Sequence, residues 1–172
     1  ALATFAAKTW DEEIVPLVTS YIAIPAKSPM FDADWAANGH IDKVIHDAAR
    51  WVESKKVAGL KLEVVRIEGR TPVIFFEVPA TKSGSTDTIC LYGHLDKQPE
   101  FNGWRNDLGP WTPKYVDGLL YGRGGADDGY AGACVPGTAA RYSLDARSSG
   151  HDLLERTRRG AGARQRSPGA DR

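Results

Sequence analysis

The stretch Thr88–Asp96, with the sequence TICLYGHLD, decides the fold class of this chain. Its first five residues are typical of a buried strand, and a turn and a His-x-Asp pair follow them. Ligands of open α/β sheets bind beyond the carboxyl ends of strands, so His94 and Asp96 lie where a functional site is expected. Alternate residues of an extended segment face the same way, so both side chains can reach one pocket.

The elements before this stretch predict an α/β fold. Thr9 begins a capping-box pattern, and the helix that follows it should end before Pro25. A second amphipathic helix is predicted over 41–56. Strands are predicted over 60–67 and 73–78, and the second is so apolar that we expect it to be covered on both faces.

The elements after it bring two further carboxylates. An Asp-Gly pair predicts a hairpin over 115–121, and the hairpin leads into the glycine-rich segment 122–129. Asp127 and Asp128 lie in that segment. Adjacent acids in such a loop are commonly solvated or cap a helix, but a carboxylate can also bridge the two cations of a two-metal hydrolase.

The His-x-Asp pair leaves a similar choice open. A bare pair of this kind is commonly a simple hydrogen-bonded contact at a strand end, because three-residue patterns recur by chance. A neutral imidazole is also a good zinc ligand, and a carboxylate nearby would fix its tautomer. In a metal site Asp96 would be either that orienting group or a ligand itself.

Charge and composition divide the 172 residues into two parts. Residues 1–132 carry 14 Lys and Arg against 18 Asp and Glu, whereas residues 133–172 carry 8 Arg against 4 acids. The second part contains no Ile, Phe, Trp, Met or Lys, so we expect it to be disordered or the product of a shifted reading frame. This change of composition predicts a folded part over 1–132 and a tail over 133–172.

Two cysteines, Cys90 and Cys134, make no disulfide framework and favour a reducing, cytoplasmic compartment. No run is long enough to cross a bilayer, so no membrane partner is expected. The arginine-rich tail supports an alternative of another class, a non-catalytic fragment with a basic nucleic-acid-binding arm. Basic composition is its only support, because no aromatic residues are interleaved.

Several motifs together resemble the N-terminal half of the catalytic domain of the M20 metallopeptidases. They are YGHLDKQP at 92–99, Gly103-Trp104, Pro110-Trp111 and DGLLYGRGGADDG at 117–129. The family includes carnosinase-like dipeptidases, acetylornithine deacetylase and succinyl-diaminopimelate desuccinylase. The resemblance covers roughly residues 8–132. It implies part of a three-layer αβα zinc-peptidase-like domain with a mixed sheet, lacking the smaller dimerisation domain.

The resemblance also implies roles for single residues. His94 would bind one metal ion, Asp127 would bridge two, and Asp96 would be the catalytic-site carboxylate that orients His94. The peptide bond Asp127–Asp128 would be cis. The cofactors would be two divalent ions, with zinc expected first and cobalt or manganese as alternatives.

The implied activity is hydrolysis of a dipeptide or an N-acyl amide by metal-activated water. The alternative within the superfamily is an N-acyl-amino-acid deacylase or desuccinylase. The family's Glu-Glu pair, which supplies the general base and a ligand, does not occur after residue 132. We therefore expect a truncated chain with little or no turnover, whose full-length relatives are homodimers acting on small peptides or N-acyl amino acids.

Overall fold

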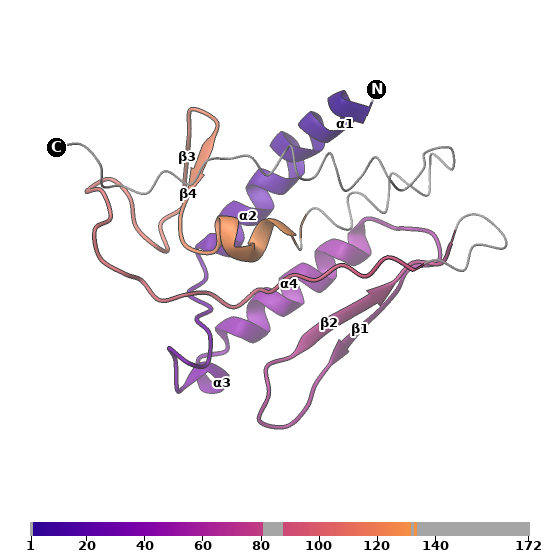
Figure 1. Ribbon diagram of the computed structural model, residues 1–172, viewed down its shortest axis with the longest axis horizontal. Helices are drawn as coiled ribbons and strands as arrows, with labels where there is room; N and C mark the ends of the chain where they lie inside the picture. The colour runs from indigo at the N-terminus through magenta and orange to yellow at the C-terminus, as the bar shows by residue number, and fades with distance from the viewer. Residues whose placement is uncertain (1, 81–87, 132, 134–172) are drawn as a thin grey trace.

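The computed structural model describes residues 2–80, 88–131 and 133, and Figure 1 shows their arrangement. The described part of the chain contains both helices and strands, in agreement with the predicted α/β fold class. In chain order the elements are α1 (Leu2–Thr9), η1 (Trp10–Ile14), α2 (Val15–Ile22), α3 (Trp35–Asn38), α4 (His40–Ser54), β1 (Lys61–Val65), β2 (Val73–Glu77), β3 (Lys114–Val116), β4 (Leu119–Tyr121) and η2 (Gly125–Gly129). No helix among these described residues is long and apolar enough to cross a membrane.

The N-terminal helix begins earlier than the sequence predicts. It runs from α1 through the π-helical turn η1 into α2. Thr9 has helical backbone angles and makes no side-chain capping bond, so the capping-box prediction is wrong. The reason is that α1 already supplies helical carbonyls in front of Thr9. The helix ends at Ile22, before Pro25, as predicted.

The wide turn η1 lies directly before a proline. Val15 donates its N–H to the carbonyl of Trp10, five residues back. Pro16 stands in the first turn of α2 and has no N–H to donate. A proline ring inside a regular helix clashes with the carbonyl four residues before it, and a wider turn gives that carbonyl room.

Helices α2 and α4 form the core. The predicted helix over 41–56 is confirmed as α4, and its apolar stripe is buried. The cluster joins α2 to α4 through the buried residues Ile14, Val18, Tyr21, Ile22, Ala26, Ile41, Val44, Ile45 and Ala133. Trp51, Leu95 and Leu120 are among the partly buried residues that pack against it. The motif at residue 94 is thereby attached to this helical core.

Strands β1 and β2 pair antiparallel, with Leu62 opposite Phe76 and Val64 opposite Ile74. These four residues are half buried, and α4 lies along the hairpin (Figure 1). On the other face Phe75 is 57% exposed. The expectation that this strand is covered on both faces is therefore wrong for the described residues, because a helix covers one face only.

The strand expected over 88–92 forms no ladder with any described strand. Its apolar residues are exposed, and so is Cys90. The mixed sheet is thus reduced, in the part that the structure describes, to two separate antiparallel pairs. A strand sequence becomes a strand only when a neighbouring strand accepts its hydrogen bonds.

The hairpin predicted over 115–121 is confirmed as β3 and β4. Asp117 and Gly118 occupy its turn with φ of 53° and 75°. Two consecutive positive φ values are those of a type I′ turn, whose twist matches that of the strands. The hairpin leads directly into the glycine-rich segment that carries Asp127 and Asp128.

Candidate metal centre

Two of the carboxylates that the sequence singles out, Asp96 and Asp127, lie next to the imidazole of His94. His94 Nε2 lies 3.2 Å from Asp127 Oδ1. His94 Nδ1 lies 3.1 Å from the carbonyl oxygen of Asp96 and 3.3 Å from Asp96 Oδ1. The fold therefore brings Asp127 to His94 across 33 positions of sequence.

The contacts of His94 define its protonation. Both acceptors at Nδ1 belong to Asp96, so Nδ1 carries a hydrogen and donates it. In the neutral imidazole Nε2 then holds a lone pair, and that lone pair faces a carboxylate oxygen of Asp127. Two lone pairs repel each other, so a proton or a metal cation is needed between Nε2 and Asp127.

The pKa of His94 reflects this arrangement. Partial burial lowers the pKa. The hydrogen bond to the backbone of Asp96 and the charges of Asp96, Asp127 and Asp128 raise the pKa by more than burial lowers it. The net pKa lies above the usual value of histidine. The site is therefore one in which a positive charge at the imidazole is favoured.

The loop that carries the acids has an unusual backbone. The peptide bond between Asp127 and Asp128 is cis, as the family resemblance implies. The Asp128 carboxylate accepts a hydrogen bond from the backbone N–H of His94 at 3.3 Å. Gly129 donates its N–H to the carbonyl of Gly124 at 2.8 Å, which closes the loop. Asp128 thus ties this loop to the His94 motif, a role that the sequence analysis does not predict.

The glycines of this loop lie directly against α2. A Cβ at Gly122 would lie 2.3 Å from the Ile22 side chain, and one at Gly129 would lie 2.3 Å from the Tyr21 ring. A Cβ at Gly124 would lie 2.8 Å from the side chain of Lys97. Close contact with neighbouring side chains is therefore a reason for glycine at these positions, beside the backbone freedom that glycine provides.

Lys97 and Tyr21 are two residues of this region that sequence reasoning missed. Lys97 is 1% exposed, and burial lowers its pKa to about 7. The pKa of Tyr21 is raised by burial and by the charges of Asp96, Asp128 and Asp127. A lysine directly after the His-x-Asp motif reads as an exposed loop residue, so only the nearby glycines could have indicated its burial.

The distance between His94 and Asp127 fits a shared metal ion. Two ligands of one tetrahedral zinc, each about 2.0–2.2 Å from the metal, lie about 3.3–3.6 Å apart. The 3.2 Å between Nε2 and Oδ1 is close to that value. Metal-bound histidines usually donate their other ring N–H to a carboxylate or carbonyl, and Asp96 offers both.

The donor set is nevertheless incomplete in the described ranges. No group of three His, Cys, Asp or Glu side chains that could hold a metal is present there. A catalytic zinc site uses three protein ligands, and His94 and Asp127 could supply two of them. The residues fit part of a metal centre.

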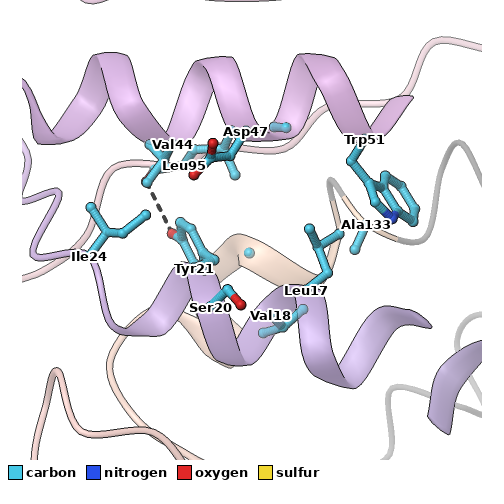
Figure 2. A pocket seen from close by; sticks show the side chains of 12 residues that line it. Leu17, Val18, Ser20, Tyr21, Ile24, Val44, Asp47, Trp51, Leu95 and Ala133 are labelled. Carbon is cyan, nitrogen blue, oxygen red and sulfur yellow. Dashed lines mark hydrogen bonds between the residues drawn. The ribbon is translucent and has the colours of Figure 1, made fainter. Parts of the chain in front are cut away.

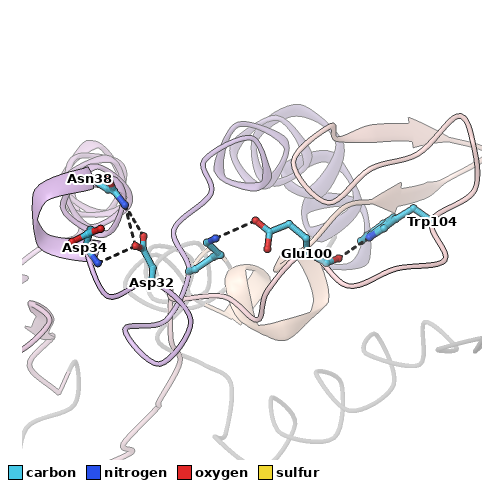
Figure 3. A network of polar contacts seen from close by, with 6 residues as sticks. Asp32, Asp34, Asn38, Glu100 and Trp104 are labelled. Atoms are coloured by element: carbon cyan, nitrogen blue, oxygen red, sulfur yellow. Dashed lines mark hydrogen bonds and ion pairs between the residues drawn. The ribbon is translucent and has the colours of Figure 1, made fainter.

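Two hollows lie near these elements. An apolar cavity of about 60 Å³ separates α2 from α4, and Tyr21 and Leu95 line it (Figure 2). A polar hollow of about 340 Å³ is lined by residues that include Lys27 and Asp32. Lys27 forms an ion pair with Glu100 at 3.2 Å, and the Asp32 carboxylate accepts hydrogen bonds from the Asn38 amide (Figure 3). Neither hollow contains the His94 imidazole.

Comparison with known proteins finds a family that part of the chain is similar to. Residues 90–145 match the model of peptidase family M20/M25/M40. The match includes His94, Asp96 and Asp127. This segment of the chain is therefore similar to the M20 peptidases, as the motifs imply.

The similar proteins include dipeptidases and desuccinylases. The chain is 54% identical over 43 residues to Beta-Ala-His dipeptidase of Mus musculus, covering 24% of this chain and 8% of that protein. The Homo sapiens protein of that name is 44% identical over 59 residues, covering 33% and 11%. Succinyl-diaminopimelate desuccinylase of Nautilia profundicola is 41% identical over 46 residues, covering 27% and 12%. The matched segment thus spans about a tenth of the full length of each of these relatives.

A solved structure shares the fold. The crystal structure of human carnosine dipeptidase 1 superposes with a TM-score of 0.62 at 24% sequence identity. The alignment covers 84% of this chain and 31% of that chain. The described helices and strands therefore have the fold of one part of a carnosine dipeptidase.

The predicted tail has no structural test. Apart from Ala133, residues 133–172 lie outside the described residues, and so does residue 132. The domain boundary at 132, the shifted reading frame and the nucleic-acid-binding arm stay predictions. The cytoplasmic location and the homodimer of full-length relatives stay predictions as well.

Proposed function

We propose that this chain carries part of the metal centre of an amide-bond hydrolase. His94 and Asp127 are its ligands, and Asp96 is the residue that orients His94. The observation that supports this most is the contact series from Asp96 through both nitrogens of His94 to Asp127. The metal that we propose is zinc, with cobalt and manganese as alternatives, because imidazole and carboxylate suit all three.

When bound, such metal ions activate a water molecule and polarise the substrate carbonyl. The protein's own contribution is orientation. Asp96 accepts a hydrogen bond from Nδ1–H of His94, and this bond directs the Nε2 lone pair toward Asp127. The Asp127 side chain is 64% exposed, so its second oxygen is accessible to a second cation.

The substrate class that we propose is the dipeptide. Two of the relatives above are named Beta-Ala-His dipeptidase, and the human one matches over the longest segment of the three. An N-succinyl amino acid is the second candidate, favoured by the match to succinyl-diaminopimelate desuccinylase. With two ligands in the described residues, we expect weak metal binding and little turnover by this chain alone, with a general base supplied by residues other than those described.

Cobalt titration tests the metal centre. Co²⁺ bound to a protein site has visible absorption, so a titration reports both affinity and ligand environment. We expect His94→Ala and Asp127→Ala each to weaken Co²⁺ binding at least tenfold. His46→Ala is the matched control, since His46 is an exposed histidine of α4. Equal Co²⁺ affinity in the wild type and all three variants would overturn the proposed centre.

Hydrolysis assays test the substrate class. The chain is incubated with zinc, manganese or cobalt and with either β-alanyl-histidine or an N-succinyl amino acid. Low turnover that favours the dipeptide and disappears in His94→Ala supports the proposal. Faster hydrolysis of the succinyl compound would favour the deacylase instead.

A further inference from the structure

The geometry points to Lys97 and Tyr21 as a pair of positioning residues for the His94–Asp127 centre. This inference rests on the proposed function, because it concerns how the two proposed ligands are brought together. Neither side chain contacts the ligands directly. Together they bind the segment 95–97, which follows His94, to the end of α2, and they pack against the glycines on either side of Asp127.

The first part of the argument is the attachment of the His94 motif to α2. Lys97 Nζ donates to the carbonyls of Tyr21 and Ile24, each at 2.6 Å, and lies 3.4 Å from the carbonyl of Ile22. These carbonyls lie at and just beyond the end of α2, where no following helical turn supplies N–H donors. The carbonyl of Tyr21 also accepts from the N–H of Ile24, and that of Ile24 from the N–H of Ala26. A cation is favoured there by the helix dipole as well.

Tyr21 completes the attachment in the opposite direction. Its hydroxyl donates to the carbonyl of Leu95 at 3.0 Å, and Figure 2 shows this bond beside the cavity. The Lys97 ammonium lies 3.8 Å from the centre of the Tyr21 ring. The segment 95–97, which directly follows His94, is therefore bound to one helix end by hydrogen bonds in both directions.

The second part is the contact with the loop of Asp127. Gly124 packs against the alkyl chain of Lys97, and Gly129 packs against the ring of Tyr21. These two glycines are also joined to each other by the hydrogen bond that closes the loop. Asp127 lies between them in sequence. The same two side chains that bind the His94 segment thus form the surface under the Asp127 loop.

Burial makes this surface rigid. Lys97 and Ile22 are the two largest fully buried side chains among the described residues. The backbone of Lys97 is fixed too, since it exchanges hydrogen bonds with Ala26 and Ser28. A ligand pair must be held within about 0.5 Å of its working geometry, and such fixed neighbours supply that constraint.

Two substitutions with matched controls test the inference in the full chain. Lys97→Met keeps the length and removes the ammonium, and its control Lys27→Met removes a lysine paired with Glu100 on the surface. Tyr21→Phe removes only the hydroxyl, and its control is Tyr115→Phe at an exposed tyrosine of β3. Tyr21→Phe also serves if Lys97→Met fails to fold, because the ring and its packing remain.

Two measurements are made on each folded variant. Co²⁺ titration gives the affinity and the visible spectrum of the centre, and backbone amide NMR shifts of Asp127 and Gly129 are recorded without metal. We expect Lys97→Met and Tyr21→Phe to weaken Co²⁺ binding about tenfold, to alter the cobalt spectrum and to move both amides. Both controls should stay within about twofold of the wild type.

The outcomes separate this inference from the proposed function. Folded Lys97→Met and Tyr21→Phe proteins with wild-type cobalt affinity and unmoved amides would show a purely structural role and overturn the inference. If the wild type binds no Co²⁺, the proposed function fails, and the metal-free amide shifts decide the inference alone. Movement of the Asp127 and Gly129 amides in both variants would then uphold the positioning role, and unmoved amides would overturn it.

Discussion

His94 Nε2 and Asp127 Oδ1 lie 3.2 Å apart, although 33 positions separate them in sequence. The contact joins the loop after the predicted third strand to the loop after the β3–β4 hairpin. Because Asp96 accepts a hydrogen bond from the other ring nitrogen, the contact places a lone pair of His94 against the anionic carboxylate of Asp127. This relationship favours a positive charge between the two side chains.

Replacing Asp96 by Asn tests its role as the orienting residue. The side-chain carboxylate would be lost, while its backbone carbonyl would still accept from Nδ1. We expect Co²⁺ affinity to fall 10- to 100-fold, the usual effect of removing an outer partner of a metal-bound histidine. Asp117→Asn is the control, because Asn suits the positive φ of that turn. A similar loss in both variants would argue against the assignment.

The burial of Lys97 predicts a pH-dependent stability. Its pKa falls from 10.5 to about 7 on folding, so the unfolded chain holds the proton over a range in which the folded chain has released it. The free energy of unfolding should therefore rise with pH above about 7, and this gain should be lost as pH falls through 7. Urea unfolding at pH 6, 7, 8 and 9 measures the slope. In Lys97→Met the rise between pH 7 and 9 should be smaller, and an unchanged slope would contradict the prediction.

Two glycines with nearly equal φ separate backbone strain from packing. Gly124 has φ of 88° and Gly103 has φ of 85°, but only Gly124 has a side chain within 4 Å of its missing Cβ. Substitution by Ala should destabilise the protein by about 1 kcal/mol at Gly103, from backbone strain alone. At Gly124 overpacking against Lys97 should add about 1–3 kcal/mol. Thermal and urea unfolding of both variants would reveal the difference, and equal losses would mean that the contact is relieved at no cost.

Two valines compare the buried face of α4 with the outer face of the β1–β2 hairpin. Val44 of α4 is 2% exposed, whereas Val73 of β2 is 57% exposed. Removing two buried carbons costs about 2 kcal/mol, so Val44→Ala should lose that much stability. Val73→Ala should lose less than about 0.5 kcal/mol, as surface substitutions usually do. A large loss at Val73 in solution would show that this face is covered in the protein.

The sequence predicted the elements whose signals are local. The apolar stripe of α4 has a regular spacing, and the Asp117-Gly118 pair specifies its turn by itself. The capping-box prediction at Thr9 failed because a cap exists only if no helix precedes it, and α1 does. The strand over 88–92 failed because strand formation depends on a partner that the sequence of the segment cannot specify.

The same division holds for the candidate site. His94, Asp96 and Asp127 could be named because their residue types suit metal binding, and the structure brings them together. Tyr21 and Lys97 could not, because their part depends on contacts across 74 and 76 positions of sequence. The glycines of segment 122–129 are apparent in the sequence, but the side chains that they contact are not. Their contacts with α2 become visible only when the helix is in place.

The close contact of Gly129 with Tyr21 makes the two positions interdependent. An alanine at 129 has no room while a tyrosine ring stands 2.3 Å from its Cβ, but a smaller residue at 21 would provide that room. A change that is harmful at either position alone can therefore become acceptable when the other position changes with it. The sequence freedom of the loop that bears Asp127 is set by a helix more than a hundred residues earlier in the chain.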